Sequence, residues 1–172
     1  MKNDREQQDR FMRLYEPVHQ QFLRYCEVLT KDSEAAKDLV SEVVLTAYQK
    51  LDRLKKEGSF LYFLFGIARH THLNLLRKRK RETRFNGAEM QFQDRTAPPD
   101  VSADVRLLYE AMEQLPDKQR EALVLFEISG FAIKEIQQIQ GGSLSAVKLR
   151  LVRGREKLKK ALLEHTPVSN RD

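Results

Sequence analysis

The feature that most constrains the fold of this chain is residues 115–163, where short apolar-periodic stretches alternate with glycines and end in a basic stretch. Gly130 follows the first apolar run, and the pair Gly141-Gly142 follows the second, which predicts a helix over 132–140. A basic helix placed after a short glycine turn is the layout of a helix-turn-helix, whose second helix enters a DNA major groove. The segment therefore predicts a nucleic-acid-binding module.

The last helix of this segment is expected to bury one face. Either Ser143 or Ser145 can cap its N-terminus by accepting a backbone N–H. At about 100° per residue, the outer face presents Leu149 and Val152, which can meet thymine methyl groups or offer an apolar patch to a protein. The face expected to turn toward the core carries residues at helical spacing: Val147, Leu151, Gly154 and Leu158.

Positive charge is concentrated in two segments. Residues 69–84 and residues 148–160 each contain seven Lys or Arg and one Glu, a local charge of +6. Because the whole chain carries +6, the remaining residues together carry −6. One such segment is as often a solvated helix face as a binding site, but two on an otherwise acidic chain are the footprint of phosphate binding.

The rest of the composition favours an all-α protein in a reducing compartment. Helix formers dominate, and the 172 residues include only seven glycines and five prolines. The single cysteine, Cys26, cannot form an internal disulfide and lies in a helical apolar pattern. No apolar run reaches the length of a membrane span, and the polar N-terminus is unlike a signal peptide, so we expect a cytoplasmic protein.

Three longer helices are expected in the first half of the chain. Apolar spacing predicts the first over 11–28. Asp32 or Ser33 can cap the second, which runs to about residue 54. Ser59 can cap the third, which begins with aromatic residues and ends in the basic tract. The second helix is expected to turn six apolar residues inward: Ala36, Leu39, Val40, Val43, Val44 and Ala47.

Residues 86–104 differ in composition from their flanks. This stretch has no helical apolar stripe, contains a glycine and two adjacent prolines, and carries a net charge of −3. Its 19 residues are many for a structureless loop within one compact domain. We therefore expect two small helical domains, 1–85 and 105–164, joined by a flexible acidic linker at 86–104, with a disordered tail at 165–172.

The aromatic start and basic end of the third helix allow two interpretations. Its first turns carry Phe60, Tyr62, Phe63 and Phe65, and the basic tract follows. These rings can all be core residues of a small domain. Alternatively, aromatic rings interleaved with Lys and Arg bind single-stranded DNA, because bases stack on the rings and phosphates meet the cations.

Residues that carry chemistry in enzymes are not grouped in this sequence. His70 and His72 are two residues apart and cannot share a helix face as metal ligands do. Asp38 and Glu42 lie on one face, but without a histidine or a second carboxylate pair they are better suited to a surface contact. No phosphate-binding glycine loop or nucleophile elbow occurs. We expect a binding protein with no catalytic residues, no bound metal and no cofactor.

Two sets of motifs occur in order on either side of the acidic stretch. The first comprises AAKDLVSEVVLTAYQKL at 35–51 and FLYFLFGIARHTHLNLLRKRKR at 60–81. The second comprises LPDKQREALVLFEISGFAIKEI at 115–136 and SLSAVKLRLVRGREKL at 143–158. Together they resemble regions two and four of the extracytoplasmic-function sigma factors, the compact two-domain members of the sigma-70 family of bacterial RNA polymerase.

The resemblance implies a role for each part. Region two would bind the clamp helices of the largest polymerase subunit, and its third helix, with the loop 52–59, would open and hold the −10 promoter element. Region four would lie on the polymerase flap and place its last helix at the −35 element. The linker would pass through the channel later used by RNA, and an anti-sigma factor or a recruiting protein would bind region four.

The resemblance also assigns residues to three surfaces. The polymerase-binding positions, whose mixed acidic and apolar character suits a protein surface, are Asp38, Leu39, Glu42 and Val43. The residues that would bind and melt the −10 element are Phe60, Phe63, Arg69, His70, Arg77, Lys78, Arg79 and Arg81. The residues that would contact the −35 element are Ser143, Ser145, Lys148, Leu149, Val152 and Arg153.

The chain departs from the family pattern at several positions. Phe63-Leu64 stands where Trp-Leu is common, and His70 stands where Asn is usual. In the helix-turn-helix, Gln140 and Gly142 stand where apolar residues usually close the core. Each lost apolar side chain removes about 1.5–3 kcal/mol of burial, which predicts a weakened small domain.

Three alternatives remain open besides a sigma factor that reads both elements unaided. Because Leu149 and Val152 occupy the reading face, −35 readout would be weak and a partner bound to region four would help to choose the site. A helix-turn-helix regulator acting on duplex DNA without polymerase would explain region four but leave the aromatic-basic helix unused. An enzyme acting on nucleic acid is disfavoured by the missing catalytic residues.

Overall fold

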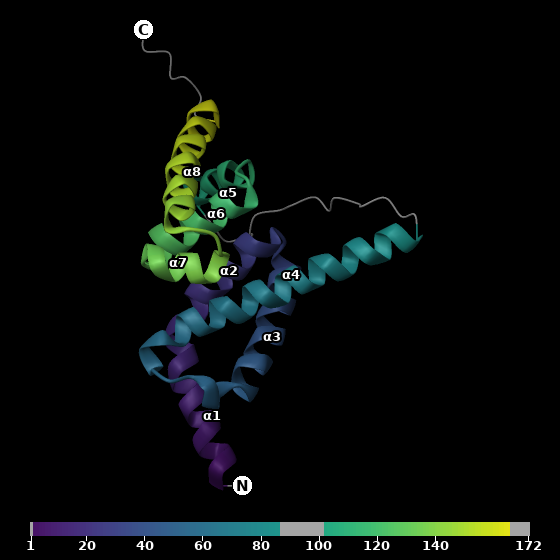
Figure 1. Cartoon of the computed structure of the whole chain (residues 1–172), viewed down its shortest axis with the longest axis vertical. Helices are drawn as coiled ribbons and strands as arrows, with labels where there is room; N and C mark the ends of the chain where they lie inside the picture. The colour runs from purple at the N-terminus through teal and green to yellow at the C-terminus, as the bar shows by residue number, and fades with distance from the viewer. Residues whose placement is uncertain (1, 87–101, 166–172) are drawn as a thin grey trace. The chain divides into compact units, whose positions relative to one another are not determined.

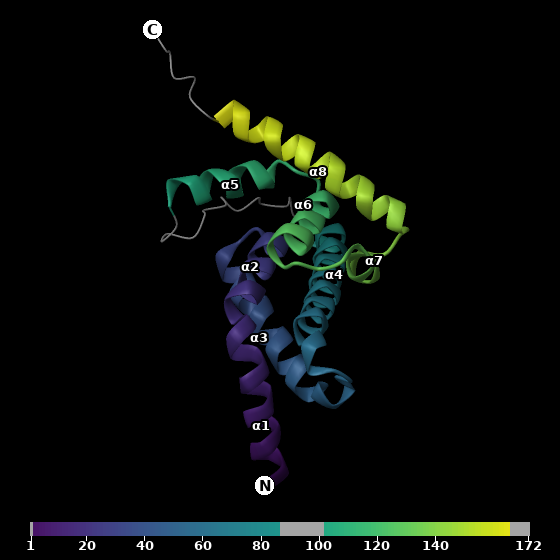
Figure 2. The same cartoon turned by 90° about the vertical axis from the view of Figure 1, so that its left-hand side faces the viewer.

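The computed structural model describes residues 2–86 and 102–165, and helices account for nearly all of them (Figure 1 and Figure 2). No strand occurs among these residues. The chain divides into two compact units, which are described separately below. The predicted all-α class and two-domain organisation are confirmed. The linker and the tail that the sequence predicts lie almost entirely outside the described residues.

The described part of unit 1 (Met1–Arg95) contains four α-helices, whereas the sequence predicted three. The single helix expected over 11–28 is wrong, because Pro17 has no N–H to continue the hydrogen-bond ladder and falls in a 3-10 turn, Glu16–Val18. The second expected helix ends before residue 54 and is followed by the 3-10 turns Leu51–Arg53 and Glu57–Ser59. The α-helices of unit 1 are α1 (Lys2–Tyr15), α2 (His19–Thr30), α3 (Ser33–Gln49) and α4 (Phe60–Asn86).

An aromatic core holds the first half of α4 against α2 and α3. The rings of Tyr25 and Phe65 stack at 3.9 Å, and both residues are fully buried. Phe60 is also buried and meets the ring of Phe11 edge-on at 5.6 Å. Cys26 lies in the same core, and burial raises the pKa of its thiol above the usual range. This core fixes the direction in which α4 leaves the unit.

Unit 2 (Thr96–Asp172) contains the predicted helix-turn-helix. Gly130 precedes it at φ +70°, and Gly141 and Gly142 form its turn at φ +74° and +88°, values that glycine adopts without strain. Ser143, not Ser145, caps the last helix, since its Oγ accepts from the N–H of Ala146 at 3.1 Å. The elements are α5 (Ala103–Glu113), α6 (Asp117–Leu123), a π-helix (Val124–Ile128), α7 (Ile133–Gln140) and α8 (Leu144–His165).

The long helix α8 packs along α5, α6 and α7 with the face that the sequence predicted. Val147 and Leu151 are buried, and Leu158 is half-buried. Gly154 lies so close to α6 that an added Cβ would stand 3.2 Å from two carbon atoms of Leu123. A side chain at this position would therefore hold the two helices apart.

Gln140 closes the turn of the helix-turn-helix with a buried polar network rather than leaving a gap. Its Nε2 donates to the backbone oxygen of Lys118 at 3.0 Å and to the Glu121 carboxylate at 2.8 Å. Its Oε1 accepts from Nη1 of Arg150 at 3.1 Å, and the same nitrogen donates to the backbone oxygen of Gly141. The expectation that Gln140 merely weakens the core is therefore corrected, because the network joins α6, α7 and α8.

The close approach at Gly154 predicts that valine lowers stability more at position 154 than at position 66. Gly154→Val is expected to destabilise unit 2 by about 1–3 kcal/mol, because the new side chain overlaps Leu123. Gly66 is the matched control, since it lies on α4 with no atom within 4 Å of an added Cβ. Gly66→Val is expected to change stability by less than about 0.5 kcal/mol. Urea unfolding followed by circular dichroism measures both, and equal losses would refute the packing argument.

The polar network predicts that an apolar residue at position 140 harms the domain. Gln140→Leu is expected to cost about 1–3 kcal/mol, because the buried Glu121 carboxylate loses its amide donor. Gln137→Leu removes one exposed hydrogen bond, from Nε2 to the backbone oxygen of Gly142, and is expected to cost less than about 1.5 kcal/mol. Amide hydrogen exchange along α8 reports both changes. A gain in protection in Gln140→Leu would show that an apolar closure is better here.

Candidate nucleic-acid and partner interfaces

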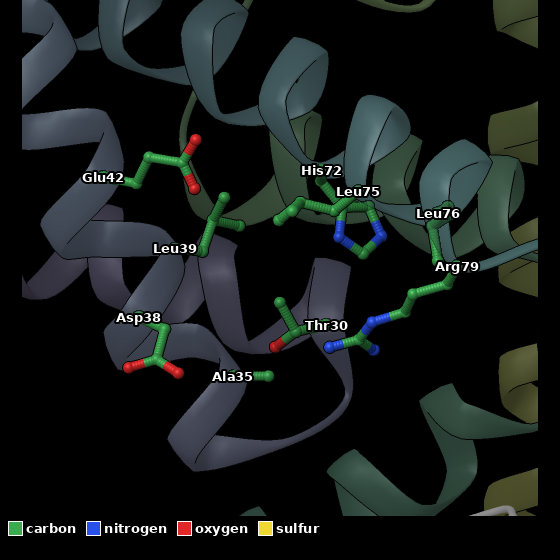
Figure 3. A pocket seen from close by; sticks show the side chains of 9 residues that line it. All are labelled: Thr30, Ala35, Asp38, Leu39, Glu42, His72, Leu75, Leu76 and Arg79. Carbon is green, nitrogen blue, oxygen red and sulfur yellow. The ribbon is translucent and has the colours of Figure 1, made fainter. Parts of the chain in front are cut away.

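A pocket of about 250 Å³ opens in unit 1 where the end of α2 and the start of α3 face the middle of α4. Figure 3 shows Asp38 and Glu42 on α3 across from His72 and Arg79 on α4, with the Arg79 guanidinium turned toward Thr30. The lining combines apolar side chains with two carboxylates from α3 and a guanidinium from α4. The lining residues are Thr30, Ala35, Asp38, Leu39, Glu42, His72, Leu75, Leu76 and Arg79.

The predicted polymerase-binding set is only half exposed. Asp38 and Glu42 lie on the outer face of α3, but Leu39 is 1% exposed and Val43 is fully buried. The expectation that all four share an accessible face is therefore corrected, since Leu39 and Val43 belong to the core. At about 100° per residue, the outer face continues to Leu45, which is 59% exposed. Leu45 was missed in the sequence. The signal that could have found it is an apolar residue on an otherwise polar helix face.

Part of the predicted −10 set forms one outward stripe on α4. At about 100° per residue, Phe63, His70, Arg77 and Arg81 fall opposite the face that packs on the core. Asn74 lies on the same stripe, and its Nδ2 is 3.1 Å from Nε2 of His70. Phe63 is half-buried, and the polar members of the stripe are exposed. The stripe thus begins with an aromatic ring and ends with two guanidinium groups.

Other members of the predicted −10 set lie elsewhere. Phe60 is 2% exposed and packed against Phe11, so its assignment to a DNA surface is corrected to a core role. Arg79 points into the α3–α4 pocket rather than along the stripe. Arg69 and Lys78 lie on the flanks of α4, the first half-buried and the second exposed. Of the aromatic residues, Phe60 and Phe65 are therefore core residues, whereas Phe63 lies on the outward stripe, where a base could stack.

The loop that precedes α4 is tied to α1. The carboxylate of Glu57 accepts from Nε of Arg10 at 3.1 Å and from Nη2 of Arg13 at 3.2 Å. The hydrogen bond from Arg10, aided by the nearby charges, holds the pKa of Glu57 below its usual value. No local pattern predicted a role for Arg10 and Arg13, because they lie more than 40 residues from their partner.

The recognition-helix set lies at the start of α8. Ser145, Lys148 and Arg153 are exposed, whereas the hydroxyl of Ser143 serves as the helix cap. Leu149 and Val152 are 47% and 49% exposed, on the face opposite the buried stripe. The predicted exposure of this apolar pair is therefore confirmed, whereas its contact with DNA stays a prediction.

Two cations of the second basic tract are engaged within unit 2. Arg150 joins the network of Gln140, and Arg155 pairs with the Glu127 carboxylate at 2.6 Å while lying over the Phe126 ring. These contacts hold α8 on both flanks of its packed stripe. They leave Lys148 and Arg153 as the exposed cations nearest Leu149 and Val152.

Within residues 2–86 and 102–165, no group of three or more His, Cys, Asp or Glu side chains could hold a metal ion. In the same residues, no helix is both long enough and apolar enough to cross a membrane. The two surfaces that the structure does present are a basic, partly aromatic helix face in unit 1 and a basic, partly apolar helix face in unit 2.

Two family models match these two units. The model of sigma-70 region 2 matches residues 14–82, and the model of sigma-70 region 4 matches residues 106–158. The first match spans α2, α3 and most of α4, and the second spans α5 through the packed part of α8.

Known relatives share both units. The chain is 31% identical over 134 residues to the ECF RNA polymerase sigma factor EcfG of Rhodopseudomonas palustris, covering 76% of this chain and 72% of the relative. It is 30% identical over 153 residues to the RNA polymerase sigma factor YlaC of Bacillus subtilis, covering 86% and 88%. The sigma factor RpoE of Bartonella quintana, solved with the anti-sigma factor NepR, matches with a TM-score of 0.79 and 25% identity, covering 91% of this chain and 98% of that one. The chain therefore belongs to the extracytoplasmic-function sigma factors of the sigma-70 family.

Proposed function

We propose that this protein directs core RNA polymerase to specific promoters and takes part in opening them, without bond chemistry of its own. The observation that carries the proposal is the presence, in one chain, of an aromatic-basic stripe on α4 and an exposed recognition helix α8. A regulator that binds only duplex DNA needs the second surface and has no use for the first. As a partner of polymerase, the protein would act in the cytoplasm.

The outer stripe of α4 is the proposed site for the −10 element. The core packing of Phe65 against Tyr25 holds the helix rigid, so the stripe is preorganised when DNA arrives. Phe63 offers a ring edge or face to an unstacked base, and His70 with Asn74 offers hydrogen-bonding groups beside it. Arg77 and Arg81, one and two turns further on, would hold phosphates of the same strand.

The loop before α4 belongs to the same proposed site. Arg10 and Arg13 of α1 hold Glu57, which fixes the backbone immediately ahead of Phe60. A loop fixed in this way can present a shaped surface to a flipped base, since little ordering remains to be done on binding.

The outer face of α3 and the adjoining pocket are the proposed polymerase-docking surface. Asp38, Glu42 and Leu45 present two carboxylates and one exposed apolar side chain. Beside them, Leu75 and Leu76 of α4 line the pocket and are partly exposed, so they can contact an apolar side chain of the partner. A complementary helix would carry basic residues opposite the carboxylates and insert an apolar residue between them.

Unit 2 is proposed to bind the −35 element with α8 in the major groove and to contact the polymerase flap. RpoE of Bartonella quintana was solved with the anti-sigma factor NepR. CnrH, which matches with a TM-score of 0.65 at 21% identity, was solved with the cytosolic domain of CnrY. We infer that this chain too is bound and kept inactive by an anti-sigma protein until the genes under its promoters are to be transcribed.

The docking surface predicts a charge-reversal effect on polymerase binding. Glu42→Lys is expected to weaken binding of the full chain to core polymerase roughly tenfold or more, because it places like charges together at the contact. Leu45→Ala is expected to act in the same direction through lost apolar contact.

Glu6→Lys makes the same charge change at an exposed position of α1 and is the matched control. Fluorescence anisotropy of labelled protein titrated with core polymerase gives the dissociation constants. Equal binding by the Glu42 and Glu6 variants would remove the docking assignment, and no binding by the unaltered chain would remove the proposed function.

A further inference from the structure

The start of α8 carries apolar surface that the fold does not use. Leu149 and Val152 are about half exposed, whereas Val147 and Leu151, their neighbours along the chain, are buried in the core. The two residues are three positions apart, so their side chains lie side by side on one face. They occupy the second and third turns of the helix, opposite its packed stripe.

The charges around this pair match a DNA groove. Lys148 lies beside Val152 on one flank of the pair, Arg153 lies beside Leu149 on the other flank, and both cations are exposed. The apolar pair thus stands between two cations, which is the arrangement that places phosphates at the sides and base edges at the centre. A protein partner would more often meet a larger apolar patch with fewer cations at its edge.

The chemistry of the groove floor decides which bases suit such a face. Guanine, adenine and cytosine present only donors and acceptors in the major groove, whereas thymine also presents its C5 methyl group. An aliphatic side chain over a polar base edge displaces water from the hydrogen-bonding groups of the base and makes no hydrogen bond with them. Over a methyl group, the same side chain removes apolar surface from water on both sides.

We propose that Leu149 and Val152 are specificity-determining residues that select thymine at neighbouring base pairs of the −35 element by contacting the C5 methyl groups. This inference rests on the proposed placement of α8 in the major groove. It gives the apolar pair a reading function in place of the hydrogen-bonding side chains expected there. It also makes −35 recognition by this chain dependent on methyl groups rather than on donors and acceptors.

The test uses holoenzyme reconstituted from the full chain and core polymerase, with duplexes selected by that holoenzyme from a random library. Each thymine of the −35 element is then replaced by deoxyuridine, which removes only the methyl group. Binding is expected to weaken roughly fourfold for each contacted methyl. Where cytosine replaces a contacted thymine, 5-methylcytosine is expected to restore part of the loss.

Two variants decide which side chains are responsible. The double variant L149S/V152S is expected to bind thymine and deoxyuridine duplexes equally. Leu163→Ser changes a 65% exposed leucine near the other end of α8 and is expected to keep the full discrimination. If deoxyuridine has no effect, or if L149S/V152S still discriminates, the inference is overturned.

The remaining outcomes separate this inference from the proposed function. If the holoenzyme opens promoters at −10 but selects no −35 sequence until another protein is added, the apolar pair is a protein contact, and the inference alone fails. If no holoenzyme forms, or if the holoenzyme selects no promoter, the proposed function fails together with the inference.

Discussion

The packing of one apolar stripe of a long basic helix against a small core is the constraint on which both units depend. In unit 1 the buried face of α4 includes Phe65, stacked on Tyr25, and in unit 2 the buried face of α8 includes Gly154 against Leu123. Each core is small because each unit has only a few short helices to cover its long one. The rest of each long helix is therefore exposed, rigid and rich in cations, as a nucleic-acid-binding surface requires.

Polar contacts then set the direction of each helix. Gln140 joins α6, α7 and α8 through Glu121 and Arg150, which fixes the angle between the two helices of the helix-turn-helix. Glu57, held by Arg10 and Arg13, fixes the chain just before α4. Such networks add little net stability compared with apolar burial, but they determine one geometry among several of similar energy. The binding surfaces inherit that geometry.

Local patterns in the sequence predicted the local structure well. Glycines at 130, 141 and 142, a serine cap and apolar spacing were sufficient for the helix-turn-helix and for the buried face of α8, because these signals act within a few residues. Two local features differ from the prediction: Pro17 breaks an otherwise helical pattern, and α3 ends at Gln49 before two 3-10 turns.

The errors concern residues whose surroundings come from distant parts of the chain. Leu39, Val43 and Phe60 were given surface roles from matching positions in the family, yet tertiary packing uses them in the core. For Leu39 and Val43, apolar spacing had predicted this burial, so the family match and the periodicity disagreed. Gln140 seemed a defect because its partners Glu121 and Arg150 lie 19 and 10 residues away. Periodicity shows which residues share a face, but only the packed structure shows whether that face is covered.

On this account, the two surfaces act together on polymerase to recognise a promoter. Transcription in vitro from genomic DNA, with start sites mapped for core polymerase with and without the full chain, tests it most directly. New start sites that share one sequence near −35 and another near −10 are the predicted result. The contradicting result is that the chain binds the same DNA as a duplex while start sites remain those of core polymerase alone.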